Sequence, residues 1–149
     1  PNFLAKNVNM SFDDIDAALN KQSGLLGISG VSSDMRDVEQ AAAAGNARAQ
    51  LALDVLAHRV LQYIGAYAIE LGRVDAIVFT GGIGENGKGF RAQIVERLTA
   101  LGIKLNAQAN DVRGKEAIIS SDDSPIKVMV VPTNEELVIA RDTKEIVGK

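Results

Sequence analysis

The stretch Val74-Asp-Ala-Ile-Val-Phe-Thr-Gly-Gly-Ile-Gly-Glu-Asn86 decides the fold of this chain. Its first half is short, apolar and rich in β-branched residues, and Gly72 and Gly81 bound it. This pattern is typical of a strand that is buried on both faces. Apolar residues then recur at helical spacing over residues 90–101, and Gly102 follows as a C-cap. The sequence therefore predicts a strand, a glycine turn and a helix in succession.

The glycines after the predicted strand are a candidate ligand site. Glycine lets the backbone adopt positive φ and approach a ligand closely, and the N-terminus of a following helix favours phosphate or polar groups. Gly82, Gly84 and Gly87 satisfy the G-x-G-x-x-G pattern of dinucleotide-binding turns. Such a turn requires an acid about 20 residues further on, and residues 101–110 contain none. We therefore reject a dinucleotide site, and a tight turn without a ligand remains the alternative.

Periodicity predicts the elements on either side. Ser11 and the acids after it start a helix that ends around residues 23–24, and the Gly- and Ser-rich residues 25–33 are predicted as a loop. Residues 47–71 form one long helix whose apolar residues lie on several faces, so we expect it to be covered on more than one side. Two further strands and a closing helix are predicted over residues 117–119, 127–131 and 133–147.

The start of the last helix carries two neighbouring acids. Thr133 as the N-cap would place Glu136 at the third helical position, where it would complete a capping box. Glu135 is then left over, and a carboxylate at a strand-to-helix junction can hold Mg²⁺ directly or through waters. The alternative is that both glutamates merely complement the helix dipole.

The polar segment Ser32-Ser-Asp-Met-Arg36 is a third candidate. Asp34 and Arg36 could grip a ribose or a purine edge, since a guanidinium can also lie flat on a base. Equally, Asp34 could be an ordinary N-cap and Arg36 a solvated charge.

Composition narrows the class of protein. The chain has 149 residues, 46% of them apolar, which fits one globular domain. The net charge is −3 and the basic residues are scattered, which argues against nucleic acid as a partner. The sequence has no Cys and no apolar run of about 20 residues that could span a membrane. We expect a cytoplasmic protein, and because the first residue is Pro1, a fragment of a longer chain.

Together these motifs resemble acetate kinases, within the actin-like and sugar-kinase superfamily. The resemblance covers residues 10–143 and rests on Ser23-Gly-Leu-Leu-Gly27, Ser33-Asp-Met-Arg36, His58-Arg59, Tyr63-Ile-Gly-Ala-Tyr67, residues 75–86 and Val131-Pro-Thr-Asn-Glu-Glu-Leu-Val-Ile-Ala140. It implies an α/β fold: the C-terminal half of a duplicated actin-like ATPase fold (ribonuclease H-like), a mixed sheet flanked by helices and truncated at its N-terminal strands. Residues 1–149 would be a C-terminal nucleotide-binding domain.

The resemblance also implies a site and its ligands. ATP or ADP and Mg²⁺ would be the cofactors, with Glu135 as the metal-associated acid. The adenosine pocket would be lined by Asp34, Met35, Arg36, Gly81, Gly82, Ile83, Gly84, Glu85 and Asn86.

The family's catalytic Asp and two catalytic Arg belong to the part that precedes this chain, as do an Asn-x-Gly-Ser-Ser-Ser-x-Lys segment and a His-Leu-Gly-Asn-Gly loop. We therefore expect no catalytic residue in this chain, a missing N-terminal domain of the same enzyme as its partner, and no activity alone. The resemblance also implies that the enzyme forms a homodimer. Propionate or butyrate kinase, or a non-catalytic nucleotide-binding domain, are the alternatives to acetate kinase.

Overall fold

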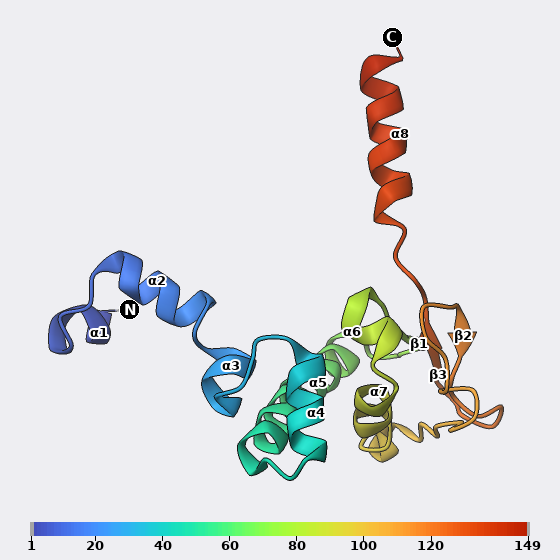
Figure 1. The fold of residues 1–149 in the computed structure, drawn as a ribbon. Helices are drawn as coiled ribbons and strands as arrows, with labels where there is room; N and C mark the ends of the chain where they lie inside the picture. The colour runs from blue at the N-terminus through green and yellow to red at the C-terminus, as the bar shows by residue number, and fades with distance from the viewer. Residues whose placement is uncertain (1, 149) are drawn as a thin grey trace. The chain divides into compact units, whose positions relative to one another are not determined.

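The computed structural model describes residues 2–148, which divide into two compact units, residues 2–64 and 65–148. Figure 1 labels the elements of both units in chain order.

The first unit is helical. It contains α1 (Asn2–Asn7), α2 (Phe12–Asn20), α3 (Gly24–Ser29), α4 (Met35–Ala43) and most of α5 (Ala47–Leu71). The predicted start of α2 is confirmed, because Ser11 and Asp14 form a complete capping box. The predicted long helix over residues 47–71 is also confirmed.

The loop predicted over residues 25–33 is wrong, because its first half forms α3. Gly30 ends this helix in the left-handed conformation, with φ of 69°. The guanidinium of Arg48 in α5 donates to the carbonyl oxygens of Ile28 (2.9 Å) and Gly27 (3.1 Å). A contact from 20 residues away thus satisfies carbonyls that the helix end leaves free, and the local composition carries no sign of it.

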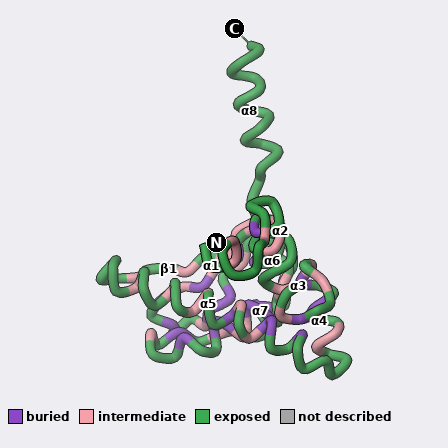
Figure 2. The backbone as a smooth tube through the Cα atoms, turned by 90° about the vertical axis from the view of Figure 1, so that its left-hand side faces the viewer, coloured by how far each residue is buried: buried purple, intermediate pink, exposed green. Residues whose placement is uncertain are grey.

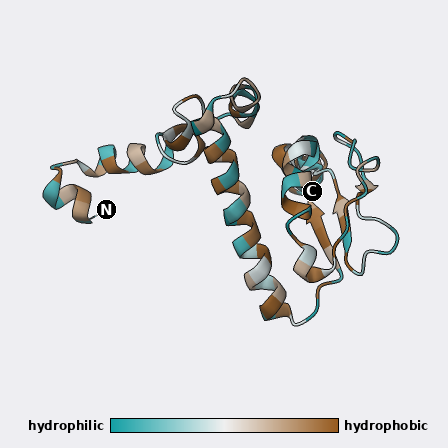
Figure 3. Ribbon diagram, turned by 90° about the horizontal axis from the view of Figure 1, so that it is seen from below, coloured by the Kyte–Doolittle hydropathy of each residue, from teal (hydrophilic) through white to brown (hydrophobic). Residues whose placement is uncertain are grey.

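Helix α5 is less covered than predicted. Its buried residues are Ala49, Ala52, Leu53 and Ala57. Tyr67 and Ile69 in its last turns are 61% and 83% exposed. Figure 3 shows hydrophobic and hydrophilic residues side by side along this helix. In the described part of the chain, therefore, α5 has a buried face along its first half and none along its second half.

The second unit is built on a three-stranded sheet. The strands are β1 (Ala76–Phe79), β2 (Ala117–Ile118) and β3 (Lys127–Val130), and their order is β1-β3-β2. β1 pairs with β3 in parallel, with Ile77 opposite Val128, and β2 pairs with β3 antiparallel, with Ile118 opposite Met129. The sheet is therefore mixed, and the predicted α/β fold with a mixed sheet flanked by helices is confirmed.

Burial follows the strand order. The central strand β3 buries Val128 and Val130 completely, whereas Val78 in the edge strand β1 is 51% exposed. The prediction that β1 is buried on both faces is therefore wrong, since the described part of the chain pairs it and covers it on one side only.

Helices follow β1 directly. α6 (Gly81–Asn86) occupies the predicted glycine turn, and α7 (Lys88–Val95) comes next. The helix predicted over residues 90–101 breaks at Glu96, where hydrogen bonds change to the i→i+3 pattern and lead into the 3₁₀ turn η1 (Thr99–Leu101). Gly102 caps that turn with φ of 71°, as predicted. The closing helix α8 (Glu135–Val147) is exposed along its whole length (Figure 2).

Candidate functional site

The glycine segment, Gly81–Asn86, leaves the carboxyl end of β1 as helix α6. Gly81 has φ of 70°, a conformation that side chains disfavour, so this is the position where the chain turn requires glycine. The N-cap residue Thr80 makes no side-chain cap. Instead the Gly81 N–H donates to Oε1 of Glu85 at 2.9 Å, so the helix is capped by its own fifth residue.

Gly82 and Gly84 differ in what surrounds them. A Cβ at Gly84 would lie 3.1 Å from the Phe79 carbonyl carbon, so this glycine lets α6 pack closely on β1. A Cβ at Gly82 would meet nothing within 4 Å. Close packing against Phe79 therefore explains why position 84 is a glycine, whereas no neighbouring atom explains the glycine at position 82.

Glu85 joins this segment to a distant part of the chain. Its Oε1 also accepts from the Thr133 N–H (2.9 Å) and the Thr133 hydroxyl (3.0 Å), 48 residues away. These bonds, the backbone one foremost, hold the pKa of the Glu85 carboxyl below its ordinary value. Glu85 is thus an ionised link between the glycine segment and the connection from β3 to α8.

Arg91 in α7 fixes the same segment from the inside. Its side chain is fully buried, and its guanidinium donates to five oxygens. Two belong to the backbone of Gly84 and Glu85, and three to Asn110 and Val112. Burial lowers the pKa of this guanidinium, and the charge of Arg113 lowers it further.

Sequence reasoning missed Arg91, although a signal was present. Arg91 lies three, four and seven positions before Ile94, Val95 and Leu98, all of which are buried. An arginine on the apolar stripe of a helix either breaks that stripe or is buried with partners.

The predicted capping box at the last helix is wrong. Asn134 is the N-cap of α8, and its Oδ1 accepts from the Leu137 N–H at 3.0 Å. Thr133 directly precedes this cap, and its hydroxyl donates to Glu85. Glu135 and Glu136 are then the first two helical residues, and both are exposed. The described residues contain no group of three or more His, Asp or Glu that could hold a metal ion by itself.

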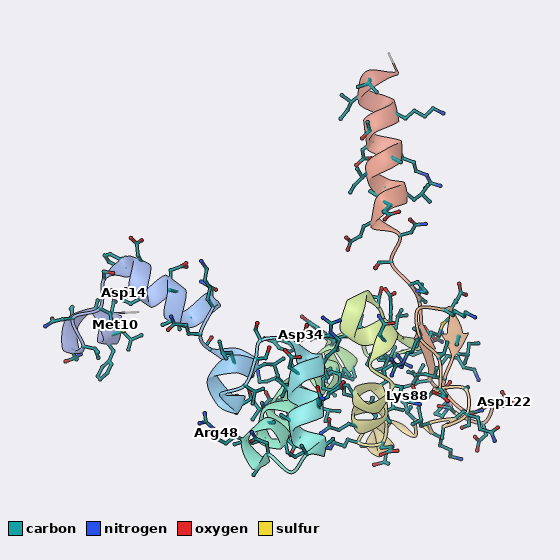
Figure 4. All side chains as sticks on the ribbon, in the orientation of Figure 1. Met10, Asp14, Asp34, Arg48, Lys88 and Asp122 are labelled. Carbon is teal, nitrogen blue, oxygen red and sulfur yellow. The ribbon has the colours of Figure 1, made fainter. Side chains whose placement is uncertain are left out.

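Asp34, Met35 and Arg36 belong to the first unit, at the start of α4. Figure 4 labels Asp34. Asp34 is the N-cap and accepts from the Arg36 N–H at 2.9 Å, which confirms the capping alternative. Its carboxylate also pairs with the Arg36 guanidinium at 2.5 Å, and this hydrogen-bonded pairing lowers the pKa of Asp34 to about 2. Met35 is buried in the core of this unit. The other candidate residues lie in the second unit.

Known proteins with this sequence pattern are kinases of small carboxylates. The sequence profile of the Acetokinase family matches residues 2–141. Acetate kinases from Clostridium novyi (strain NT) and Clostridium botulinum (strain Loch Maree / Type A3) are 54% and 57% identical over 99% of this chain, which spans 37% of each.

Solved structures agree. The acetate kinase of Porphyromonas gingivalis superposes with a TM-score of 0.89 at 44% identity, over 98% of this chain and 37% of that one. A propionate kinase from Francisella tularensis gives 0.85 at 43% identity, over 95% and 36%.

None of the helices in the described residues has the length and apolar character needed to span a bilayer.

The family profile covers nearly the whole chain, and the acetate kinase relatives are more than 50% identical to it. This chain belongs to the acetokinase family.

Proposed function

We propose that this chain is the adenosine-binding part of an acetate kinase, which transfers the γ-phosphoryl group of ATP reversibly to acetate. The observation that supports this most is the place of Gly82, in the segment that leaves the carboxyl end of β1, together with the open space beside it. Gly65 and Gly89 also have open space but do not lie in that segment. A glycine whose missing side chain is explained neither by φ nor by a neighbouring atom is suited to close approach by a ligand.

In this proposal the glycine segment and the α4 start contact adenosine. The carboxylate of Glu85 occupies the N-terminus of α6, where it would repel a phosphate. The segment is therefore better suited to the uncharged base and ribose than to the phosphates. Ile83, 44% exposed, offers apolar surface to a purine. Asn86 donates to the Gly82 carbonyl at 3.0 Å, which holds the open stretch of backbone in shape.

In the first unit, Met35 would support the pocket from the core while Asp34 and Arg36 present polar groups. The guanidinium of Arg36 is exposed in its ion pair with Asp34. Exposed ion pairs contribute little to stability, so either side chain can turn to a ribose or a base at a small cost in free energy.

The reaction breaks the bond between the γ-phosphorus and the bridging oxygen to the β-phosphate, and forms one to an acetate carboxylate oxygen. ADP leaves with the electron pair, and acetyl phosphate is the other product. This chain would bind and orient ATP in that step. The groups that bind acetate and stabilise the transferred phosphoryl would come from outside it, since such transfer depends on charge stabilisation around the moving group.

Glu135 would be the metal-associated acid. It is a single exposed carboxylate at the first position of α8, and the described residues place no acidic cluster around it. One carboxylate fits Mg²⁺, which keeps several waters and binds through few protein ligands together with phosphates. When bound, Mg²⁺ would neutralise charge on the phosphates.

The test is a hydroxamate assay on the full-length enzyme that contains this sequence, with ATP and with acetate, propionate or butyrate. We expect the highest kcat/KM with acetate. Propionate kinase is the second candidate, because the Francisella tularensis structure carries that name. Nucleotide binding without acyl phosphate formation from any of the three acids would contradict the proposal and indicate a non-catalytic nucleotide-binding protein.

A further inference from the structure

The side chain of Glu85 connects two parts of the second unit, the glycine segment and the start of α8. The proposed function gives these parts separate roles. One oxygen accepts three hydrogen bonds, from Gly81 in the glycine segment and from the amide and hydroxyl of Thr133. Thr133 is followed by the N-cap Asn134 and then by Glu135. Only one residue thus separates the group that Glu85 holds from the proposed metal acid.

The Glu85 backbone is itself fixed. Arg91, which is fully buried, donates to the Glu85 carbonyl at 2.9 Å and to the Gly84 carbonyl at 2.8 Å. The backbone of Glu85 is therefore held in place by Arg91. The orientation of the Glu85 side chain in turn sets the position of Thr133.

The connection from β3 to α8 has little other support. Val131 donates from its N–H to the Phe79 carbonyl at 2.9 Å, which continues the sheet, and α8 beyond it is exposed throughout. The two bonds from Thr133 to Glu85 are thus the last side-chain link between the sheet side of this unit and the start of α8 that the described residues provide.

We propose that Glu85 is a positioning residue that couples ATP and Mg²⁺ binding: it sets where Glu135 stands relative to the glycine segment. This rests on the proposed function, because the roles of the glycine segment and of Glu135 are part of it. Groups that orient a metal-associated carboxylate without touching the metal commonly change metal affinity or activity about 10-fold or more when removed.

The experiment uses the full-length enzyme and measures KM for ATP, KM for acetate and the Mg²⁺ concentration at half-maximal rate. For Glu85→Ala we expect the Mg²⁺ requirement to rise about 10-fold together with KM for ATP, while KM for acetate stays unchanged. Glu85→Gln keeps an acceptor oxygen, so it should restore most of both values. Thr133→Val removes one of the three bonds and should raise the Mg²⁺ requirement less than Glu85→Ala.

Two comparisons separate the possible outcomes. Glu116→Ala removes one exposed carboxylate elsewhere in the same unit and should change nothing. Glu135→Ala tests the proposed function directly, and if it leaves the Mg²⁺ response unchanged, that assignment and the inference built on it are both overturned. If Glu135→Ala shifts the response but Glu85→Gln, Thr133→Val and Glu85→Ala do not, the inference alone is overturned.

Stability provides the remaining distinction. A Glu85→Ala enzyme that melts early but titrates normally with Mg²⁺ would show that the link is only structural, and would also overturn the inference. Should Glu85→Ala fail to fold, the Thr133→Val variant decides, because it leaves Glu85 and both backbone bonds in place.

Discussion

Gly82 and Gly84 stand two residues apart in α6 and differ in how far the structure restricts a side chain there. The backbone and side chain of Phe79 lie 3.1–3.4 Å from a Cβ at Gly84, so a side chain there would be tightly packed, whereas nothing in the structure restricts Gly82. Positive φ, which the sequence suggested for this segment, occurs at Gly81 and not at Gly82. A substitution at Gly82 should therefore report on a ligand rather than on backbone strain.

Gly82→Val in the full-length enzyme should raise KM for ATP at least several-fold and leave KM for acetate unchanged. Its melting temperature should hardly change, because the side chain meets open space and glycine is itself a poor helix former, by about 1 kcal/mol relative to alanine. Gly84→Ala is the matched comparison and should cost about 1–3 kcal/mol of stability by overpacking. An unchanged KM for ATP in a folded Gly82→Val enzyme would return the segment to a turn without a ligand.

Asp34 gives a prediction in pH. Hydrogen bonding to Arg36 lowers its pKa from 3.8 to about 2, so the ionised cap and ion pair are stabilising above pH 3.8 and are lost as the pH falls through about 2. A carbon-13 NMR titration from pH 5 to 3 should show the Asp34 carboxyl still ionised. Arg36→Gln should bring its midpoint back toward 3.8, and a normal midpoint in the unmodified protein would contradict the ion pair.

Helix α8 depends on its N-cap because it has no buried face. Asn134, and not Thr133, caps it, so the stabilising role that the sequence assigned to Glu136 moves to Asn134. Thr133, the residue before this cap, instead donates from its N–H and its hydroxyl to Glu85.

We expect Asn134→Ala to destabilise the first turn of α8 by about 1 kcal/mol. Glu136→Ala should cost about 0.3–1 kcal/mol at most, through the helix dipole alone. Amide hydrogen exchange in α8 is the proper measurement, since an exposed helix can fray without unfolding the core. Faster exchange in Glu136→Ala than in Asn134→Ala would restore the capping box.

Arg91 holds three elements together: α7, the end of α6, and the stretch that contains Asn110 and Val112. Arg91→Met should destabilise the protein by about 3 kcal/mol or more in urea unfolding, because several buried carbonyl groups lose their donors at about 1–3 kcal/mol each. Arg91→Lys should recover only a part, since an ammonium cannot reproduce the planar fork. Arg141→Met on exposed α8 is the control and should be nearly neutral; equal losses in both would contradict the clamp.

The whole chain spans 37% of its acetate kinase relatives, and its two units contribute different candidate residues. Phosphoryl transfer relies on charge placed around the moving group. The role proposed for this chain is instead to bind and orient the nucleotide.

The isolated chain should therefore form no acetyl phosphate above background in a hydroxamate assay with ATP, Mg²⁺ and acetate. The full-length enzyme, purified in the same way, is the positive control, and a host lacking its own acetate kinase removes contamination. Turnover by the isolated chain within about 10-fold of the intact enzyme, a difference of 1.4 kcal/mol in barrier, would show that it holds the catalytic groups.

The sequence by itself determined the elements whose signal is local. The apolar β-branched run of β1, the helical spacing of apolar residues in α5 and the hydroxyl cap of Ser11 need only neighbouring residues, and all three are found where predicted. The motifs at Asp34–Arg36, Gly81–Asn86 and Glu135 were enough to indicate the family. Tertiary structure decided everything that depends on a partner far along the chain. Arg48 donates to carbonyls at the end of α3, where a loop was predicted, and Thr133 donates to Glu85 from a position where a cap was predicted. Arg91 is buried because five oxygens from separate segments converge on it. Hydrogen bonds of this kind form only once the chain has folded, since the donor and acceptor have no relation in sequence.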